Sequence, residues 1–396
     1  MKVYIIGTGM EGEKTLTKEA EKAINEAQLL IGAERMLKPF IKNEKEYFYS
    51  YDPVEIKDKI NSCNYKSAAV LMSGDCSFFS GSKKLLPILE QHDITLIAGI
   101  SSVSYFCSRL GITYEKMKFV TLHGRDSNIA INVKMNERCF FLLGGNYGIA
   151  DVCKRLCSYG MSGTTVHFGT DLGYQNEKIV TGKASDFTGI SDRGLAVMIT
   201  ENTDYLNFTP TAVNDELFQR SEIPMTKAEV RCIAISKLEI GTDSVVWDIG
   251  CGTGSVSVEA AYKCPDGKVI SFDKKTQAAA LTAENAKLFN CDNIKVIEGE
   301  CPEVLESAET PDKVFIGGSS GNMESIFQTI HSKNPHADVV VTAVSLETLH
   351  ESVNCFERHG KYPEIVQIAV SRTKKIASHT MLQGMNPVFI ISGRLT

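Results

Sequence analysis

The chain has 396 residues, of which 43% are hydrophobic and 23% are charged, close to the average for soluble globular proteins, and this length predicts two or three domains. Its net charge of −6 disfavours binding to long nucleic acids, which would require a locally basic face, and the sequence shows no stripe rich in Arg and Lys. It has neither an apolar run long enough to cross a bilayer nor an N-terminal stretch suited to a signal peptide, so we expect a cytoplasmic protein with no membrane and no nucleic-acid partner.

Three short apolar runs in the N-terminal part each lead into a loop of small residues. The runs at residues 3–6, 68–72 and 94–97 predict strands, and loops at the carboxyl ends of parallel strands surround the ligand crevice of open α/β sheets. The candidate cofactor-binding residues in these loops are Gly7, Gly9, Ser73, Gly74, Asp75, Ser101 and Ser102. Asp75 is also a candidate catalytic residue that orients bound groups; an ordinary Asx turn is the alternative.

A second group of strands is predicted from about Lys118 onward, at residues 139–143, 164–168 and 195–200. The stretch from Glu201 to Pro224 is polar, contains Pro210 and shows no long periodicity, which is typical of a linker. We place a two-lobed first domain at residues 1–205, with lobes at about 1–115 and 116–205, a linker at 206–224 and a second domain at 225–396.

Strand and helix patterns alternate through the C-terminal part. Such alternation predicts an α/β fold with a parallel sheet and helices on both faces. The predicted strands lie at residues 245–249, 268–272, 294–297, 313–316, 338–343 and 365–370, and helices between them include 276–289 and 346–358.

The loop after the first of these strands is the most informative motif. It runs from Asp248 to Gly254 as D-x-G-x-G-x-G, and its glycines let the backbone turn tightly beside a ligand. A dinucleotide fingerprint needs G-x-G-x-x-G, but its last position would fall on Ser255 or Ser257, so the loop does not fit a pyrophosphate. Asp273 follows roughly 20 residues later, where an acid commonly accepts hydrogen bonds from a ribose. S-adenosylmethionine is therefore the leading cofactor candidate, and a structural turn is the alternative.

Cysteine and histidine usage indicates no metal site. The 12 cysteines include no C-x-x-C pair, and the eight histidines show no spacing typical of metal ligands. We expect reduced thiols and no protein-bound metal.

Longer motifs in the C-terminal part carry a resemblance to a known family. They are PMTKAEVR from Pro224, VVWDIGCGTGSVSVEAA from Val245, EGECPE from Glu298 and PDKVFIGGSSG from Pro311. With these motifs, this part resembles the decarboxylating precorrin methyltransferases of cobalamin biosynthesis.

Separate motifs make the N-terminal part similar to the tetrapyrrole methylases that act on carbon 5 of the same ring. The matching residues are Leu16-Thr17, Gly32 with Arg35 and Leu37, Ser73-Gly74-Asp75, Gly99-Ile100-Ser101-Ser102, Arg109-Leu110-Gly111 and His123-Gly124-Arg125. His123 and Arg125 would reach the substrate or the domain interface, although a structural histidine is equally consistent with the sequence. Together the two resemblances cover nearly the whole chain.

The resemblance implies a two-lobed tetrapyrrole-methylase fold joined to a Rossmann-like methyltransferase fold, each with its own S-adenosylmethionine. The implied substrate is a precorrin-6B-type or cobalt-precorrin tetrapyrrole. The C-terminal domain would methylate carbon 15 and decarboxylate the carbon-12 acetate, and the N-terminal domain would methylate carbon 5. We also expect a homo-oligomer. The electron-rich ring is its own nucleophile, so the resemblance implies alignment by the enzyme rather than a dedicated base.

Family behaviour assigns roles to residues of the C-terminal domain. The candidate cofactor-binding residues are Asp248, Gly250, Gly252, Thr253, Gly254, Asp273, Glu300, Cys301 and Gly317, with Glu300 and Cys301 near the adenine. Gly317 and Gly318 lie beside the expected substrate cleft, with a simple turn as the alternative. Thr226, Lys227 and Arg231 are candidate catalytic residues, because a substrate with many carboxylates needs cationic contacts. The i, i+4 spacing of the two cations leaves open a solvated helix face.

Several N-terminal positions depart from the tetrapyrrole methylase pattern. Thr8 and Cys76 stand where the family has prolines, Ser80 stands where glycine is common, and Gly144-Gly145 stands where Thr-Asp is frequent. The departures leave a second hypothesis, in which only the C-terminal domain is active and the N-terminal domain is a binding module. The acidic charge disfavours a nucleic-acid base methyltransferase, and the glycine spacing disfavours a dehydrogenase.

Overall fold

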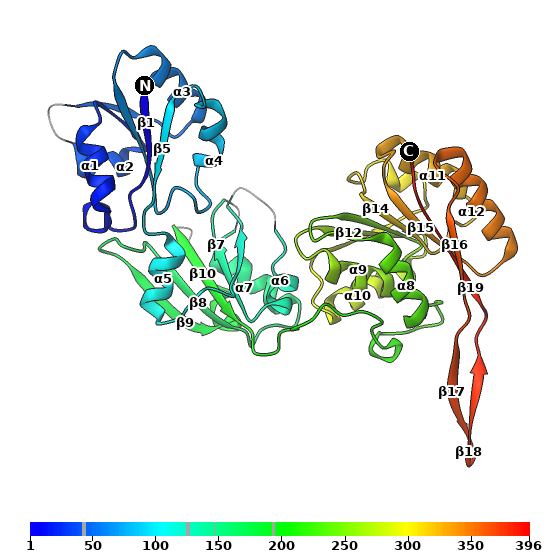
Figure 1. Cartoon of the computed structure of the whole chain (residues 1–396). Coiled ribbons are helices and arrows are strands. Elements are labelled where there is room, and N and C mark those ends of the chain that lie inside the picture. Colours follow the sequence, from blue (N-terminus) through cyan, green and yellow to red (C-terminus); the bar gives the residue numbers. More distant parts are fainter. Residues whose placement is uncertain (42–44, 124–126, 146, 192–194) are drawn as a thin grey trace. The chain divides into compact units, whose positions relative to one another are not determined.

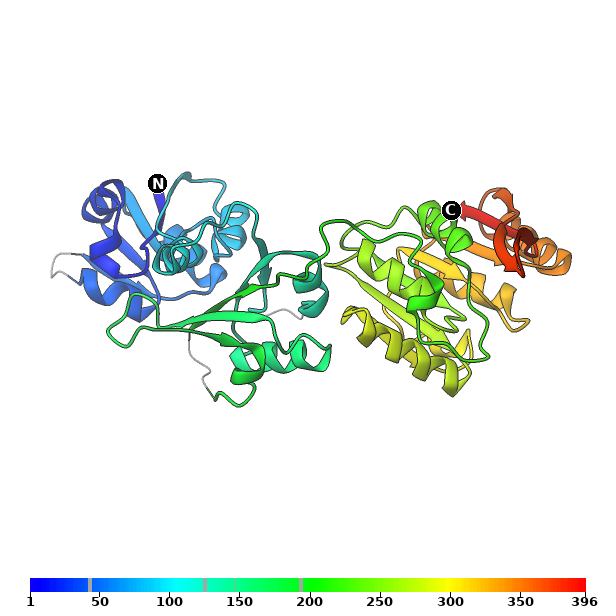
Figure 2. The same ribbon diagram turned by 90° about the horizontal axis from the view of Figure 1, so that it is seen from below.

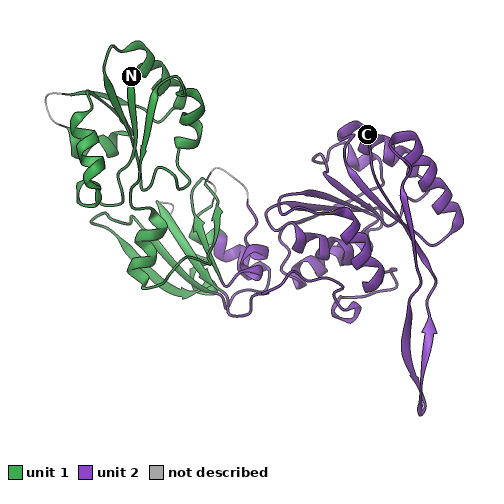
Figure 3. Cartoon of the chain, viewed as in Figure 1, with its two compact units in different colours: residues 1–125, 138–151, 165–201 green, residues 126–137, 152–164, 202–396 purple. Residues whose placement is uncertain are grey.

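The protein forms two compact units (Figure 3). The structure is a computed structural model that describes residues 1–41, 45–123, 127–145, 147–191 and 195–396. Unit 1 comprises residues 1–125, 138–151 and 165–201, and unit 2 comprises residues 126–137, 152–164 and 202–396. Within the described ranges, no helix is long and apolar enough to span a membrane.

The first sheet of unit 1 has five parallel strands in the order β3-β2-β4-β1-β5. The strands are β1 (Lys2–Gly7), β2 (Leu29–Gly32), β3 (Glu46–Tyr49), β4 (Ser67–Met72) and β5 (Asp93–Ile97), and the helices between them are α1 (Lys18–Glu26), α2 (Glu34–Leu37), α3 (Pro53–Ser62) and α4 (Ser82–Leu85). Tyr4 and Ile6 of β1 enter one core, and Val3 and Ile5 enter another. Both faces of the sheet are therefore covered, which explains why β1 is continuously apolar.

The second sheet of unit 1 is mixed, in the order β6-β7-β10-β8-β9. Its strands are β6 (Lys118–Thr121), β7 (Arg138–Leu142), β8 (Thr165–Thr170), β9 (Lys178–Lys183) and β10 (Ala196–Glu201), of which only β6 and β7 pair in parallel. Helix α5 (Ser102–Leu110) follows β5 and packs Phe106 against Phe140 and Val197 of this sheet. The two sheets confirm the predicted two-lobed arrangement.

Unit 2 is built on a seven-stranded sheet in the order β13-β12-β11-β14-β15-β19-β16. Figures 1 and 2 show the elements of this unit from two directions, coloured from green to red along the sequence. Its strands are β11 (Val245–Ile249), β12 (Lys268–Asp273), β13 (Ile294–Glu298), β14 (Lys313–Ile316), β15 (Asp338–Ala343), β16 (Glu364–Ile368) and β19 (Val388–Arg394). Its helices are α6 (Ala130–Met135), most of α7 (Ile149–Ser158), α8 (Ala228–Leu238), α9 (Ser255–Lys263), α10 (Thr276–Leu288), α11 (Met323–Lys333) and α12 (Leu346–His359).

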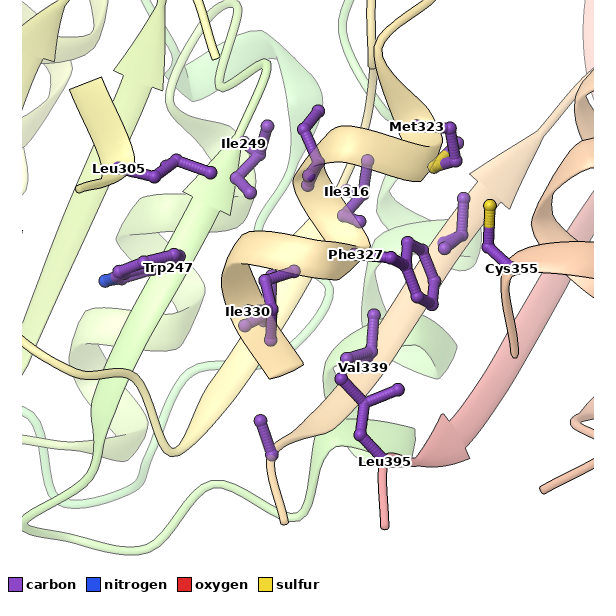
Figure 4. Packing of buried hydrophobic residues seen from close by; sticks show 14 of the residues in the cluster. Trp247, Ile249, Leu305, Ile316, Met323, Phe327, Ile330, Val339, Cys355 and Leu395 are labelled. Atoms are coloured by element: carbon purple, nitrogen blue, oxygen red, sulfur yellow. The ribbon is translucent and has the colours of Figure 1, made fainter. Parts of the chain in front are cut away.

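Helices cover both faces of this sheet. Trp247 of β11 packs in one core with Phe327 of α11 and Cys355 of α12 (Figure 4). The neighbouring residue Val246 enters a second core with Val258 of α9. This two-sided burial confirms the predicted Rossmann-like α/β fold.

The C-terminal edge of the sheet differs from the prediction. The strand expected at 365–370 ends at Ile368, and an exposed hairpin of β17 (Ser371–Ile376) and β18 (His379–Gly384) follows before β19 returns antiparallel to both of its neighbours (Figure 1). The hairpin turn contains Ala377 at φ 54° rather than a glycine, so the usual sequence signal of a hairpin is missing. The prediction of a parallel sheet is therefore wrong at this edge, where β19 pairs antiparallel with β15 and β16.

The stretch predicted as a linker, residues 206–224, is packed within unit 2. Its apolar residues Val213 and Phe218 join the core around Val246. The backbone N–H of Val213 also donates a 2.9 Å hydrogen bond to Glu259 of α9. The segment is therefore fixed to the surface of the unit.

Residues 126–137 also lie in unit 2. Asp292 accepts hydrogen bonds of 2.8 and 3.0 Å from the N–H groups of Ile129 and Ile131. Each compact unit is thus made of several separate segments of the chain. The division of the domains at 206–224 stays a prediction.

Candidate functional site

A pocket of about 1060 Å³ lies at the carboxyl ends of the parallel strands of unit 2. Ten of the predicted site residues line it: Thr226, Lys227, Asp248, Gly250, Gly252, Thr253, Asp273, Glu300, Cys301 and Gly317. The size suits a small-molecule site, for which about 300–1,000 Å³ is usual. The loops that follow β11 to β15 therefore bring most of the predicted C-terminal site together.

The glycine loop after β11 has two parts with different roles. Gly250 has φ 73°, and a Cβ there would lie 2.8 Å from the carbonyl oxygen of Gly318, so the loops after β11 and β14 meet closely. Gly254 also has φ 73°, but a Cβ there would lie 2.8 Å from Cγ2 of Thr282 in α10. Gly254 therefore faces the packing of α9 on α10, and the structure does not bring it to the pocket wall.

Asp273 ends β12 and joins two loops at the pocket. Its carboxylate accepts hydrogen bonds of 3.0 Å from the backbone N–H groups of both Gly252 and Lys275. A carboxylate has further lone pairs beyond these two bonds. Asp273 is therefore both held in place and able to accept hydrogen bonds from a ligand.

Two buried oxygen atoms on the pocket wall lack partners within the described residues. Asp248 is fully buried, and its Oδ2 accepts a hydrogen bond from the hydroxyl of Ser257. Its Oδ1 and the Oγ1 of the buried Thr253 have no hydrogen-bond partner among the described residues. Burial raises the pKa of Asp248 to about 7. Since buried polar atoms are nearly always hydrogen-bonded, these two atoms fit a ligand that brings a positive charge and hydrogen-bond donors.

Arg231 lies apart from the pocket wall. Its fully buried guanidinium forms ion pairs with Glu259 at 2.5 Å and Asp215 at 3.3 Å, and it donates hydrogen bonds of 2.6 and 2.5 Å to the carbonyl oxygens of Thr226 and Val213. Because the Arg231 side chain is fully buried and does not line the pocket, it fits neither of the two predicted positions, at the substrate or on a solvated helix face. The alternative of a solvated helix face is wrong for Arg231, because this side chain is fully buried, whereas Lys227 lies at the N-cap of α8 on the pocket wall.

Glu300 and Cys301, in the loop after β13, also line the pocket. Glu300 forms an ion pair of 3.2 Å with Lys274, and the carbonyl oxygen of Cys301 accepts a 2.8 Å hydrogen bond from Asn322. Burial raises the pKa of the Cys301 thiol to about 12, so the thiol is neutral at physiological pH.

Sequence reasoning missed the end of the hairpin as part of this pocket. Gln383 near the end of β18 lines the pocket, as do Met385 and Asn386 immediately after this strand. No local motif marks them, because their place depends on a hairpin that the sequence did not reveal.

In unit 1, the three predicted loops meet at the carboxyl ends of β1, β4 and β5. Gly9 and Gly74 exchange backbone hydrogen bonds of 3.0 and 3.1 Å. A Cβ on Gly7 would lie 2.7 Å from both the carbonyl oxygen of Gly74 and the nitrogen of Gly99. The structure thus brings the predicted loops with Gly7, Gly9, Ser73, Gly74, Asp75, Ser101 and Ser102 to one edge of the sheet.

Asp75 fastens two of these loops. Oδ1 accepts the N–H of Ser77 at 2.7 Å and the Ser77 hydroxyl, and Oδ2 accepts the N–H of Gly99 at 3.0 Å. Burial alone would raise the pKa of Asp75, but the hydrogen bonds from Ser77 and Gly99 outweigh it and lower the pKa. The Asx turn is therefore present, and Asp75 additionally ties the β4 loop to the β5 loop. On the same edge, Ser101 caps α5 by accepting the N–H of Ser104 at 3.2 Å.

Thr8 and Cys76, which stand where the family has prolines, both restrain these loops through hydrogen bonds. Thr8 donates both its N–H, at 2.8 Å, and its hydroxyl, at 3.0 Å, to the carbonyl oxygen of Met72, and the Cys76 thiol donates to that of Ile97 at 3.3 Å. Hydrogen bonds thus replace the restraint that the prolines would supply.

The Gly-Gly position also has a packing role. A Cβ on Gly144 would lie 2.2 Å from Nδ1 of His123, so glycine leaves room for this ring. Gly124 and Arg125 lie outside the described residues. Within the described part of the chain, no group of three His, Cys, Asp or Glu side chains is arranged to hold a metal ion.

Comparisons with known proteins match both parts of the chain. Residues 216–394 match the family model of the precorrin methyltransferase domain, and residues 2–188 match that of the tetrapyrrole (corrin/porphyrin) methylases. A probable cobalt-precorrin-6B C(15)-methyltransferase (decarboxylating) from Pyrobaculum calidifontis is 37% identical over 188 residues, which are 47% of this chain and 96% of that protein.

Similarity also extends over the full chain. A precorrin-6Y C(5,15)-methyltransferase [decarboxylating] from Sinorhizobium is 29% identical over 398 residues, covering 97% of this chain and 94% of that protein. Among solved structures, a precorrin-6y C5,15-methyltransferase from Geobacter metallireducens is 35% identical with a TM-score of 0.45, covering 47% of this chain and 98% of that one.

Proposed function

Because this chain belongs to the family of decarboxylating precorrin methyltransferases, we propose that it methylates carbons 5 and 15 of a precorrin-6B-type or cobalt-precorrin ring and decarboxylates the carbon-12 acetate, in cobalamin biosynthesis. The methyl donor is S-adenosylmethionine, with one molecule bound by each domain. The observation that carries the proposal is the unit 2 pocket, in which Oδ1 of Asp248 and Oγ1 of Thr253 are buried and have no hydrogen-bond partner in the part of the chain that the structure describes.

The residues on this wall fit the cofactor. Asp248 would face its positive charge, Thr253 would accept a donor from it, and Asp273 would accept the ribose hydroxyls. The cofactor supplies an electrophilic methyl group when bound. The protein's contribution is to hold the ring carbon and the donor in line, and such alignment supplies about 7–11 kcal/mol in well-oriented systems.

Decarboxylation needs no separate base in this scheme. After carbon 15 is methylated, the ring is cationic, and the electron pair of the broken carbon–carboxylate bond flows into it as carbon dioxide leaves. Lys227 would bind a substrate carboxylate, and its position at the N-cap of α8 on the pocket wall supports this role. Thr226 lies beside it on the same segment.

We propose methylation at carbon 5 for the first domain, residues 1–205. Its support is the meeting of the three loops and the Asp75 link between two of them. In this scheme Asp75 holds the loops in place rather than touching the reacting atoms, and the hydrogen bonds of Thr8 and Cys76 support an active site instead of a binding module.

We further propose a cytoplasmic enzyme that assembles as a homo-oligomer. Apolar side chains are exposed on the β17–β18 hairpin, where Ile376 is 50%, Met381 54% and Leu382 74% exposed. Light scattering of the purified chain would measure the mass of the assembly.

Titration with S-adenosylhomocysteine tests the cofactor part of the proposal. Calorimetry is expected to find two sites per chain, and an Asp273→Ala variant is expected to lose the affinity of one. One site in the wild-type chain would indicate that the N-terminal domain is a binding module, and no site would overturn the proposal.

A further inference from the structure

A second pocket, of about 310 Å³, lies in unit 1 beside the Asp75 loop. Phenylalanine side chains at 78, 79 and 119 line it, together with Ser77 and Lys83, and we call it the phenylalanine pocket. The loops after β1, β4 and β5 that we assign to the methyl donor do not account for the three phenylalanine side chains of this pocket.

The aromatic wall is held from behind. The ring centroid of Phe78 lies 5.4 Å from that of Phe119 and 5.9 Å from that of the fully buried Phe140, all in edge-to-face contacts. Such contacts fix ring orientation as well as contributing apolar area. The wall is therefore part of the rigid core of unit 1 rather than a loose surface group.

Phe79 is displayed by a strained backbone. Its φ is 47°, which bulky residues rarely adopt, and its side chain remains 46% exposed. A glycine at this position would remove the strain. Because the ring is half exposed, burial in a core does not explain why a phenylalanine stands here. Strained residues that persist in this way cluster at binding sites.

Lys83 is the only charged side chain that lines the pocket, and it forms no ion pair within the described residues. The neighbouring Lys84 lies on the same short helix but does not line the pocket. An apolar wall with one cation at its side is complementary to an apolar ring that carries a carboxylate.

The pocket is directly linked to the loops at the end of the sheet. Ser77 lines the pocket and also donates its N–H, at 2.7 Å, and its hydroxyl to Asp75. Asp75 in turn accepts the N–H of Gly99. A group bound in the pocket would thus lie beside the loops that we assign to the methyl donor.

We propose that the phenylalanine pocket binds one acid-bearing pyrrole ring of the tetrapyrrole, with Phe79 against the ring and Lys83 on its carboxylate. The proposal rests on carbon-5 methylation by unit 1. A volume of about 310 Å³ is at the lower limit for small-molecule sites, so the pocket takes one ring with its side chains while the rest of the macrocycle extends outside.

Uroporphyrin, a tetrapyrrole with eight carboxylates, is a practical probe for the full chain. In fluorescence titrations at low salt, Phe79→Gly is expected to weaken binding by about tenfold, since one aromatic contact and its buried area are lost. Its melting temperature should stay close to that of the wild type, because the relief of strain at φ 47° offsets the greater conformational entropy that glycine gives the unfolded chain. Lys83→Met should weaken binding by about fivefold, Lys83→Arg should restore it, and the matched control Lys84→Met should have no effect.

Two results separate this inference from the proposed function. Equal binding by the wild type and Phe79→Gly, including no binding by either, would overturn the inference. Turnover of the precorrin substrate tests the function: if the wild-type chain adds only one methyl group, carbon-5 methylation fails, whereas the titration still decides whether the pocket binds the ring. If the pocket binds the ring and unit 1 methylates carbon 5, Phe79→Gly should release a product with one methyl group at substrate concentrations at which the wild type adds two.

Discussion

Nη1 of Arg231 donates a 2.6 Å hydrogen bond to the carbonyl oxygen of Thr226, a residue on the wall of the unit 2 pocket. The same guanidinium is fully buried and binds Glu259 and Asp215. A buried cation that does not itself line the pocket thus fixes the backbone of its wall.

Replacement of Arg231 by methionine should mainly reduce stability. Removing one partner of a buried ion pair costs about 3–5 kcal/mol, because the remaining charge is left buried. Arg372 still pairs with Asp215 at 3.1 Å, so the larger loss should come from Glu259. Urea denaturation would measure the change in the free energy of unfolding.

Lys227→Met is the matched control, since Lys227 lies at the N-cap on the pocket wall. It should change stability by no more than about 0.5 kcal/mol but raise KM for the tetrapyrrole. Unchanged stability in the Arg231 variant, with a raised KM, would contradict the role of Arg231 as a structural cation.

The affinity of the unit 2 pocket for S-adenosylmethionine, whose sulfonium group is cationic, should depend on pH through Asp248. Since the pKa of this carboxyl is raised to about 7, it is protonated below that pH in the free protein. A cationic ligand group favours the carboxylate, so binding releases a proton, and affinity should rise up to about tenfold per pH unit until about pH 7 and then level. Calorimetry in buffers of different ionisation enthalpy would count the proton. An Asp248→Asn variant that keeps the same pH dependence would refute this assignment.

Two glycine substitutions should separate packing from binding. Gly254→Ala places a Cβ 2.8 Å from Thr282 at φ 73°, so it should lower the free energy of unfolding by about 1–3 kcal/mol. Gly318→Ala, on the pocket wall with no atom within 4 Å of the added Cβ, should keep stability and weaken ligand binding. Thermal unfolding and a ligand titration of both variants test the contrast; the reverse pattern would place Gly254 at the ligand.

Asp75→Ala should impair the first domain alone. Without its carboxylate, the Gly99 N–H and the Ser77 hydroxyl lose their partner, so the β4 and β5 loops should separate. We expect methylation at carbon 5 to fall by at least about tenfold, equivalent to 1.4 kcal/mol, while methylation at carbon 15 continues. Quantifying singly and doubly methylated products measures this.

Asp52→Ala provides the control for this variant. Asp52 also accepts two backbone N–H groups, from Val54 and Glu55, but it caps α3 away from the three loops. It should reduce stability by about 1 kcal/mol and leave both methylations in place. An equal loss of carbon-5 methylation in both variants would show that general destabilisation, not loop position, is responsible.

Local patterns were enough to find the elements that carry the unit 2 site. The strand β11 begins and ends at the predicted residues, because a buried parallel strand is continuously apolar and a glycine loop follows it. Asp273 was predictable from its distance to that loop. The same reasoning applies to the three small-residue loops of unit 1.

Features that depend on contacts distant in sequence were not predictable. The burial of Arg231 depends on Glu259 and Asp215, which lie 28 and 16 residues away in the chain. The β17–β18 hairpin turns at Ala377, a residue without turn preference. The burial of Phe218 in the stretch taken as a linker follows from the shape of the core that it covers.

The mass of the product tests the central claim most directly. The full chain would be incubated with S-adenosylmethionine and a precorrin-6B-type substrate, and the product would be analysed by mass spectrometry. The account predicts a product that has gained two methyl groups and lost one carbon dioxide. A substrate recovered with neither change would contradict it.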